Sequence, residues 1–257
     1  MYPVKLIDNT SLPFSHFDEC DSTSTYSTSC DTVSFSTPIS VSIFDWDDTL
    51  FPTKALYDNE ISFEDIFTFQ SSLKEIDASL NQKISLLEQS IINLFTELTM
   101  KKIEIFIVSN ADKKWINNCL NHFMNELKEF IEENEIKIYS AKNLFKSSTT
   151  SANWKKKCFK RVLIENFSMK STSIDLIAIV DSLEEKKATF GLKKVKYYDN
   201  AINSKFVQMV QSPNVETLIK EISTIQNNID DLFKEDKTEK CIYVNDMINV
   251  FNIDKCI

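Results

Sequence analysis

The sequence contains a single glycine, Gly191, among its 257 residues, where an average composition of roughly 7% would give about eighteen. Phosphate-binding loops built from glycine, such as G-x-G-x-x-G and the Walker loop, are therefore absent, as is the G-x-S-x-G elbow of hydrolases. Only two histidines occur, His16 and His122, which argues against histidine zinc sites and Ser-His-Asp triads. Any chemistry must use carboxylates, hydroxyls, lysine or a hard metal ion.

Basic residues are also in the minority, since 29 Lys and Arg face 38 Asp and Glu and the net charge is −9. This balance argues against binding to nucleic acid or a membrane surface, both of which need a basic face. The six cysteines form no C-x-x-C pair, which indicates reduced thiols. No apolar run approaches the ~18 residues of a membrane helix, and Met1–Thr10 lacks a signal-peptide core. We therefore expect a soluble, cytoplasmic protein.

The chain divides into three regions. Residues 1–39 are rich in Ser and Thr without a sustained hydrophobic period, which predicts a disordered arm. Residues 40–233 alternate apolar runs with helical patterns and form the predicted core. Within it, 51–80 is left for a flap and a small helical insert, so the cleft should be open or lightly covered. Residues 234–257 form a C-terminal tail to which the pattern assigns no structure.

The core predicts an α/β fold. Five short apolar runs are typical of buried strands: Val41–Phe44, Ile103–Val108, Ile136–Tyr139, Leu176–Val180 and Val195–Tyr198. Apolar residues at spacings of three and four between and after them predict helices: one near 82–100, then 116–131, 154–163 and 215–229. Strand–helix alternation of this kind predicts a doubly wound, mainly parallel five-stranded sheet.

Polar residues follow the predicted strands, at the sheet edge where such folds bind ligands. They are Asp45-Trp46-Asp47-Asp48-Thr49, Ser109-Asn110 and Asp181-Ser182, with Lys155 at the start of the third helix. A carboxylate at a strand end can attack phosphorus, which makes Asp45 the candidate nucleophile. Asp47 faces the same way if the chain stays extended through Trp46, and would then protonate the leaving oxygen and later activate water.

Carboxylates that face a phosphate dianion repel it, and each pair of unit charges at 4 Å costs about 4 kcal/mol at an effective dielectric near 20. One lysine cannot offset several such pairs, so we expect a magnesium ion bound by Asp45, Asp47 and Asp181. Lys155 would neutralise charge at the transferring group. Thr49, Ser109 and Asn110 are the candidate substrate-binding residues.

Four segments carry a resemblance to a known family. IFDWDDTL at 43–50 resembles the D-x-D-x-T signature of the haloacid dehalogenase-like (HAD) superfamily, and IFIVSN at 105–110 is similar to its second motif. Trp154-Lys155 is similar to its third motif, and DSLEE at 181–185 to its fourth, two acids four positions apart. The resemblance spans residues 40–230. D-W-D-D-T-L, S-N-A-x-x-x-W, I-Y-S-A and W-K-x-x-x-F together resemble an uncharacterised HAD group of protists.

This resemblance implies a magnesium-dependent phosphohydrolase that forms an aspartyl-phosphate and acts on a phosphorylated small molecule or protein. Two positions depart from the family pattern: Val180 replaces a glycine, and Glu185 replaces an aspartate. A branched side chain at 180 narrows the room at the metal, so a non-catalytic binding or regulatory protein of the same fold is the alternative. Asp47 argues against the dehalogenase branch, and the chain has no room for the cap of a phosphonatase.

Several of these residues also have structural interpretations. Ser182 and Glu185 match the S-x-x-E capping box and are expected around the site rather than at the metal. The segment 109–112 can cap the helix that begins near Lys113, and Lys155 begins a run of three lysines. Trp115 and Trp154 are expected in the core or at its rim.

Overall fold

The computed structural model describes residues 38–59, 61, 78–147, 150–167, 173–194, 202–234 and 240–244. The predicted arm at 1–39 lies outside these residues except for its last two, and so does most of the predicted insert at 51–80. The predicted strand Val195–Tyr198 also lies outside them.

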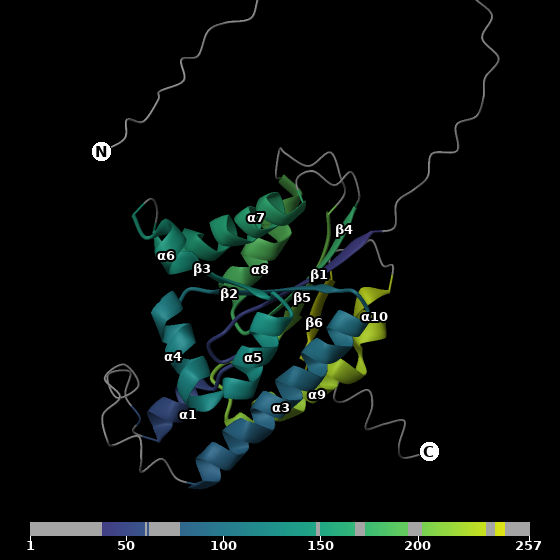
Figure 1. Ribbon diagram of the computed structural model, residues 1–257. Helices are drawn as coiled ribbons and strands as arrows, with labels where there is room; N and C mark the ends of the chain where they lie inside the picture. The colour runs from purple at the N-terminus through teal and green to yellow at the C-terminus, as the bar shows by residue number, and fades with distance from the viewer. Residues whose placement is uncertain are drawn as a thin grey trace, which may run out of the picture. The chain divides into compact units, whose positions relative to one another are not determined.

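The predicted α/β fold with a parallel sheet is confirmed, and its strands have the order β3-β2-β1-β4-β5-β6 (Figure 1). Each neighbouring pair is parallel. Within the described residues the strands are β1 (Ile39–Phe44), β2 (Glu104–Ser109), β3 (Lys137–Ser140), β4 (Ile174–Val180), β5 (Ile202–Gln208) and β6 (Lys240–Tyr243). The architecture is compatible with a Rossmann-like fold.

The described residues form six strands, where the sequence predicts five in the whole chain. β5 escapes a search for apolar runs because its sequence, INSKFVQ, is half polar. Lys205 is nevertheless 7% exposed, because its ammonium donates to the carbonyls of Leu232 (2.6 Å) and Lys234 (2.7 Å) beyond the strand. β6 lies inside the predicted tail at 234–257 and contributes only four residues.

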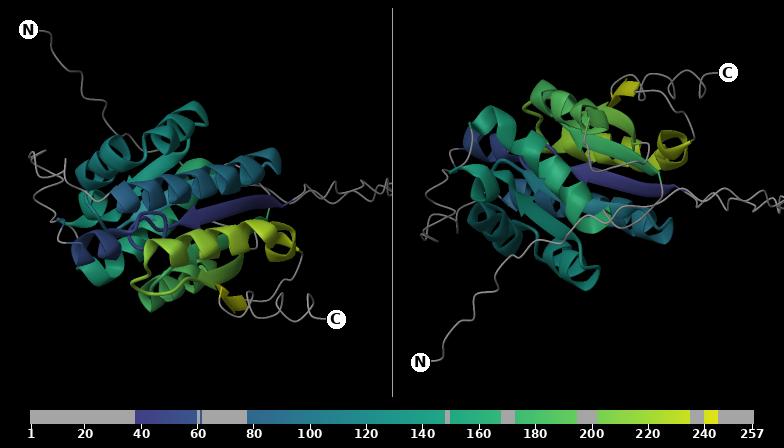
Figure 2. Two further views of the ribbon diagram at one scale, coloured as in Figure 1. Left: turned by 90° about the horizontal axis from the view of Figure 1, so that it is seen from below. Right: turned by 90° about the horizontal axis from the view of Figure 1, so that it is seen from above.

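Helices cover both faces of the sheet (Figure 2). One hydrophobic core includes residues of α1 (Thr53–Asp58), α3 (Ala78–Met100), α4 (Lys113–Phe123), α5 (Asn125–Glu133), α9 (Val215–Asn227) and α10 (Ile229–Phe233). A second core, on the other face, includes residues of α6 (Ala141–Phe145), α7 (Trp154–Phe167) and α8 (Leu183–Phe190). Short 3₁₀ helices span Ser151–Asn153 and Gly191–Lys194. Among the described residues, no helix has the length and apolar character that crossing a membrane requires.

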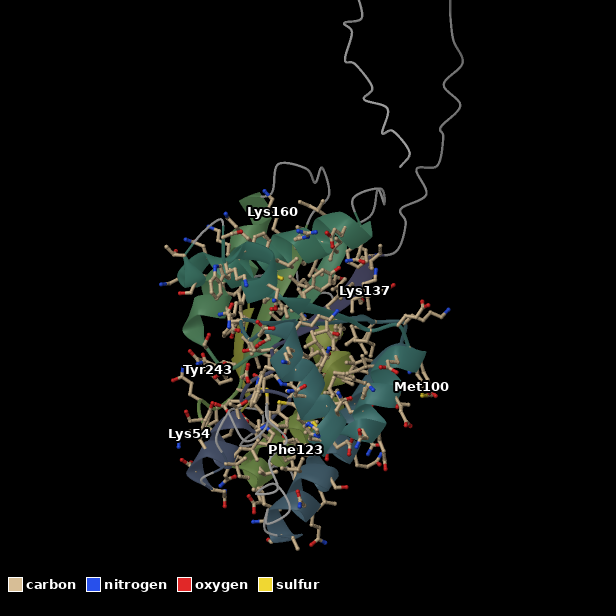
Figure 3. The ribbon with its side chains drawn as sticks, turned by 60° about the vertical axis from the view of Figure 1, so that its left-hand side comes forward. Lys54, Met100, Phe123, Lys137, Lys160 and Tyr243 are labelled. Carbon is tan, nitrogen blue, oxygen red and sulfur yellow. The ribbon has the colours of Figure 1, made fainter. Side chains whose placement is uncertain are left out.

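The single helix expected over 116–131 is wrong, because the chain breaks at Met124 (φ −141°, ψ 59°) into α4 and α5. The apolar spacing continues through the break because both helices pack on the same core. No side chain next to the start of α5 caps it. Instead Glu88 on α3, which is 6% exposed, accepts the Leu127 N–H at 2.9 Å. The last residue of α3, Met100, is 79% exposed (Figure 3).

Glu221 on α9 is another carboxyl buried inside the protein. It is 1% exposed; its Oε1 accepts the Val210 N–H at 2.8 Å, while its Oε2 has no hydrogen-bond partner among the described residues. Burial raises the pKa of Glu221 from 4.5 to about 7; the Val210 hydrogen bond opposes this shift and the charge of Asp181 adds to it. Glu221 therefore binds its proton more tightly in the folded than in the unfolded chain.

We expect this carboxyl to lower the stability as the pH rises. Between pH 4.5 and about 7, the folded state holds a proton that the unfolded state has lost, so the free energy of unfolding falls through that window by about 3 kcal/mol. Glu221→Gln keeps the acceptor for Val210 and removes the titration. In urea unfolding, the variant should gain on the wild type by about 2–3 kcal/mol more at pH 8 than at pH 5. An equal difference at both pH values would contradict the assignment.

The order of the strands marks where a ligand fits. From β1 the chain builds outward through β2 and β3, then returns to place β4 on the other side of β1. Connections that leave β1 and β4 in opposite directions open a crevice at the carboxyl ends of these two strands. Phe44 pairs with Ile179 in this register, so Asp45 and Asp181 follow at the same edge.

Candidate functional site

A pocket of about 200 Å³ opens at the carboxyl ends of β1 and β4. Every described residue that lines it is polar or charged: Asp45, Asp47, Asp48, Ser109, Asn110, Ser151, Lys155, Lys156, Asp181, Ser182 and Glu185. The structure thus brings together all but one of the residues that the sequence assigns to the site. The exception is Thr49, which is 0% exposed and lies outside this lining.

The loop after β1 directs two carboxylates into the pocket. The Trp46 carbonyl accepts the N–H groups of Leu50 (3.0 Å) and Phe51 (2.8 Å), which turns the chain back at once. Asp48 takes the left-handed conformation inside this turn (φ 54°), which aspartate tolerates better than most residues. The Trp46 side chain is buried in the core, and Asp45 and Asp47 on either side of it both line the pocket although the backbone bends at Trp46.

Asp45 is held on both sides of its carboxylate. Its N–H donates to the Ile179 carbonyl at 3.1 Å, which continues the β1–β4 pairing. Its Oδ1 accepts the Trp46 N–H at 2.7 Å, and its Oδ2 lies 2.5 Å from Lys155 Nζ. Asp45 is 6% exposed, so the lysine compensates a negative charge that water reaches only in part.

Lys155 is the member of its lysine run that faces the carboxylates. It is 8% exposed and forms ion pairs with both Asp45 and Glu185. Lys156 also lines the pocket but is exposed, and Lys157 Nζ lies 6.0 Å from the centre of the Phe145 ring. The start of α7, directly after the 3₁₀ helix Ser151–Asn153, produces this arrangement.

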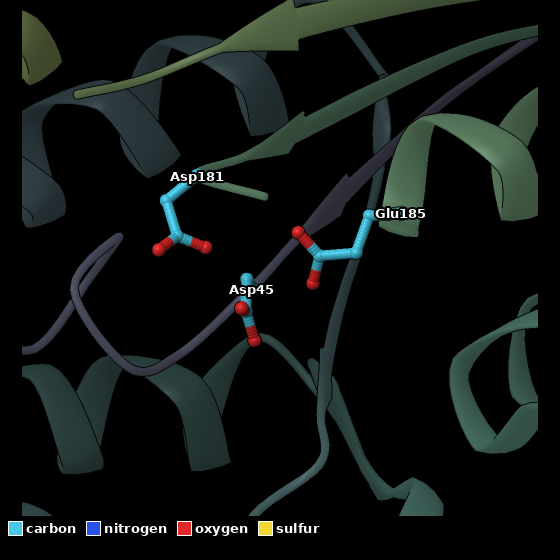
Figure 4. Close-up of side chains that lie close together, drawn as sticks. All are labelled: Asp45, Asp181 and Glu185. Atoms are coloured by element: carbon cyan, nitrogen blue, oxygen red, sulfur yellow. The ribbon is translucent and has the colours of Figure 1, made fainter. Parts of the chain in front are cut away.

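Three carboxylates converge beside this lysine. Asp45, Asp181 and Glu185 each offer an oxygen atom, and these atoms all lie within 4.8 Å of one another (Figure 4). Burial, followed by the charge of Asp45, raises the pKa of Asp181 to about 6. Such a set of hard oxygen donors suits Mg²⁺ or Ca²⁺, and a cation would relieve the repulsion that raises this pKa.

This set differs from the predicted ligands Asp45, Asp47 and Asp181. The Asp47 carboxylate is not a member, because other donors hold it: Oδ1 accepts from Thr53 Oγ1 (2.7 Å) and Trp115 Nε1 (2.9 Å), and Oδ2 accepts from Ser109 Oγ (3.2 Å). Burial, followed by the charge of Asp45, raises the pKa of Asp47. Asp47 is thus an acid whose proton is retained more readily than that of a free aspartate.

Glu185 takes part in two arrangements at once. The predicted capping box is confirmed: the N–H and hydroxyl of Ser182 donate to Glu185 Oε2 at 3.2 and 3.0 Å. Its other oxygen pairs with Lys155. Helix capping therefore orients the carboxylate of Glu185, which lies closer to the candidate cation position than the sequence suggests.

The hydroxyl of Ser109, a predicted substrate-binding residue, is occupied within the protein. Ser109 is 0% exposed; its hydroxyl accepts the Ala111 N–H at 2.8 Å and gives its one proton to Asp47. In this arrangement Ser109 supports Asp47 instead of a phosphoryl oxygen. Asn110 is exposed and lines the pocket. The expected helix cap in this segment is Asp112, which accepts the Lys114 N–H at 3.0 Å.

Val180 fits the strand that carries it. It is 0% exposed, pairs with Gln208 at the end of β4, and its carbonyl accepts the Met209 N–H at 2.9 Å. Its φ is not among the positive values of the described residues, so the backbone there does not require a glycine. An effect of its side chain on cation binding stays a prediction.

Trp115 and Thr53 contact the site although neither is among the residues that the sequence pattern assigns to it. Trp115 is 2% exposed and belongs to the core as expected, but its indole N–H reaches Asp47. A buried indole N–H usually has a hydrogen-bond acceptor, so the sequence could have indicated that Trp115 donates a hydrogen bond. The identity of the acceptor depends on tertiary structure.

Comparisons of the chain with protein-family models, with curated proteins and with solved structures find no match.

Proposed function

We propose that the protein is a magnesium-dependent phosphohydrolase of the HAD type that works through an aspartyl-phosphate. The observation that carries this proposal is the pairing of two unlike carboxyls in one polar pocket. Asp45 lies 2.5 Å from a buried ammonium, whereas burial and the charge of Asp45 raise the pKa of Asp47. Environments that separate two carboxyls in this way suit a nucleophile and an acid.

Asp45, Asp47 and Lys155 can account for both formation and hydrolysis of the aspartyl-phosphate. A carboxylate oxygen of Asp45 attacks phosphorus, the bond from phosphorus to the leaving oxygen breaks, and that oxygen takes the proton of Asp47. Asp47, now ionised, removes a proton from a water molecule, whose oxygen attacks the same phosphorus. The bond between phosphorus and Asp45 then breaks, which returns the Asp45 carboxylate, the protonated Asp47 and inorganic phosphate. Lys155 offsets negative charge in both steps.

A divalent cation fits the donor set of Asp45, Asp181 and Glu185, because all three are carboxylates within reach of one another. Bound there, magnesium would supply positive charge that neutralises the phosphoryl group. Asp181 has no hydrogen-bonded role comparable to that of Asp47 among the described side chains, so cation binding is the function we assign to it.

The pocket limits what part of a substrate can enter. Its volume of about 200 Å³ and its polar lining suit a phosphate group and not an apolar leaving group. The remainder of the substrate then extends past Asn110 and Lys156, which are exposed. We therefore propose a phosphorylated small molecule or protein whose recognition lies largely outside this pocket.

Hydrolysis of 4-nitrophenyl phosphate, with and without magnesium, tests the proposed function. We expect magnesium-dependent turnover, and a stable complex with beryllofluoride, which mimics the phosphoryl group on an aspartate. A chain that binds magnesium and beryllofluoride but hydrolyses no aryl phosphate would favour the non-catalytic alternative. A chain that does neither would contradict the proposal.

Magnesium should also stabilise the fold through Asp181. At ten times the dissociation constant the gain is about 1.4 kcal/mol, and Asp181→Asn should lose most of it. Because protonation competes with the cation, the affinity should fall about tenfold per pH unit below the pKa of Asp181, about 6. Melting curves across magnesium concentration and pH measure both effects. Asp175→Asn, at the other end of β4, is the matched control; an equal loss there would contradict the assignment.

A further inference from the structure

We propose that Trp115 is a positioning residue for Asp47: with Thr53 it occupies Oδ1, and it thereby keeps the transferable proton of Asp47 on Oδ2. This inference rests on the proposed function, because it concerns the acid of that reaction. An indole in the hydrophobic core would thus help to determine which oxygen of Asp47 donates the proton to the leaving group.

Asp47 Oδ1 has two hydrogen-bond donors of different capacity. An indole N–H can only donate, whereas a hydroxyl can donate or accept. Trp115 Nε1 lies 2.9 Å from Asp47 Oδ1, and Thr53 Oγ1 lies 2.7 Å from the same atom. A proton on Oδ1 would face the indole proton directly, so Oδ1 stays an acceptor in both charge states.

The other oxygen has a partner that can adapt. Among the described hydrogen bonds, Asp47 Oδ2 accepts only from Ser109 Oγ, at the longer distance of 3.2 Å. When Oδ2 carries the proton, the Ser109 hydroxyl can rotate so that it no longer donates to that oxygen. Protonation of Asp47 at Oδ2 therefore costs less than protonation at Oδ1.

The indole is held firmly enough to enforce this choice. The ring of Trp115 meets Phe51 edge to face (6.0 Å, 87°), and Phe51 stacks on Trp46 (5.6 Å, 5°) and contacts Phe123 (5.7 Å). Trp115 itself is 2% exposed, so neither water nor a rotamer change readily replaces its N–H. Catalytic groups need support of this kind, because small displacements cost rate.

Loss of the Trp115 indole should matter most for substrates whose leaving group needs a proton. Without the indole, the Asp47 carboxyl can turn and can carry its proton on either oxygen, so a smaller fraction presents an O–H to the leaving oxygen. A poor leaving group such as phenol depends on that proton, whereas 4-nitrophenol leaves readily without it. A structural defect alone would slow both substrates by the same factor.

The test measures kcat/KM for a series of substituted phenyl phosphates, from 4-nitrophenyl phosphate to phenyl phosphate. This ratio covers the steps through loss of the leaving group and excludes hydrolysis of the phosphoenzyme. Since general acid catalysis contributes about 10²–10⁴-fold, we expect Trp115→Phe to slow phenyl phosphate at least about tenfold more than 4-nitrophenyl phosphate. Thr53→Val should act in the same direction, and Thr53→Ser should restore the wild-type dependence.

Phe95→Leu is the control, because it changes a buried aromatic side chain of the same core whose ring contacts Phe44 and Phe130 and not Trp115. It should slow both ends of the series equally. Equal factors in Trp115→Phe and Thr53→Val would overturn the inference and leave the proposed function intact; if Trp115→Phe does not fold, Thr53→Val decides. A wild type inactive on the whole series would overturn both.

Discussion

Replacing Asp45 with asparagine should reduce phosphate ester hydrolysis by about 10⁴-fold or more while the protein stays folded. The amide has nearly the shape of the carboxylate and still accepts the Trp46 N–H through its oxygen, but it is not a nucleophile toward phosphorus. Lys155 keeps one carboxylate partner, Glu185, so the fold should tolerate the change. The measurements are turnover of 4-nitrophenyl phosphate and the yield of acid-stable, hydroxylamine-sensitive phosphoenzyme.

Asp112→Asn is the control for this experiment. It also exchanges one carboxylate for an amide, but it lies outside the pocket, and asparagine caps a helix as well as aspartate does. It should keep both turnover and phosphoenzyme. Near-wild-type rates in Asp45→Asn would show that another group attacks phosphorus.

Lys155→Met should destabilise the protein by about 3–5 kcal/mol, because it leaves the buried carboxylates of Asp45 and Glu185 without their cation. Methionine retains the length and apolar part of the side chain, so the loss of charge dominates. Lys156 is exposed, and Lys156→Met should change the stability by no more than about 0.5 kcal/mol. Urea unfolding of both variants at pH 7 compares two neighbouring lysines of the same helix turn.

A second substitution separates lost charge from lost packing. In Lys155→Met/Glu185→Gln one of the two uncompensated charges is gone, so the double variant should be more stable than Lys155→Met alone. If the double variant is less stable than either single variant, packing around Lys155 and not its ion pairs holds this part of the fold. If Lys156→Met lowers the free energy of unfolding more than Lys155→Met does, the assignment of Lys155 as the buried partner of the two carboxylates is wrong.

Local pattern was enough to predict the elements that build the pocket. β4 is almost wholly buried and appears as a nearly continuous apolar run, as central parallel strands do. β1 contains two serines but ends in four buried residues, Val41–Phe44. Asp45 and Asp181 follow them directly, so their place at the ligand-binding edge follows from the direction of the chain. The same reasoning does not predict β5, because Lys205 interrupts its apolar pattern. Lys205 can be buried only because carbonyls 27 and 29 residues further along the chain accept hydrogen bonds from its ammonium.

The sequence by itself determined which chemical groups are present at this sheet edge. The tertiary structure decided which partners each of these groups contacts. Asp45, Asp47, Lys155 and Asp181 could be chosen from strand ends and one helix start. That Asp47 is held by Ser109 and Trp115, 62 and 68 residues further along the chain, could not be read from any local spacing. Those two donors hold its carboxylate apart from the cluster of Asp45, Asp181 and Glu185, while the cap of α8 orients Glu185 within that cluster. Hydrogen bonds between distant segments exist only after the sheet and helices have packed, so the assignment of each carboxylate belongs to the fold.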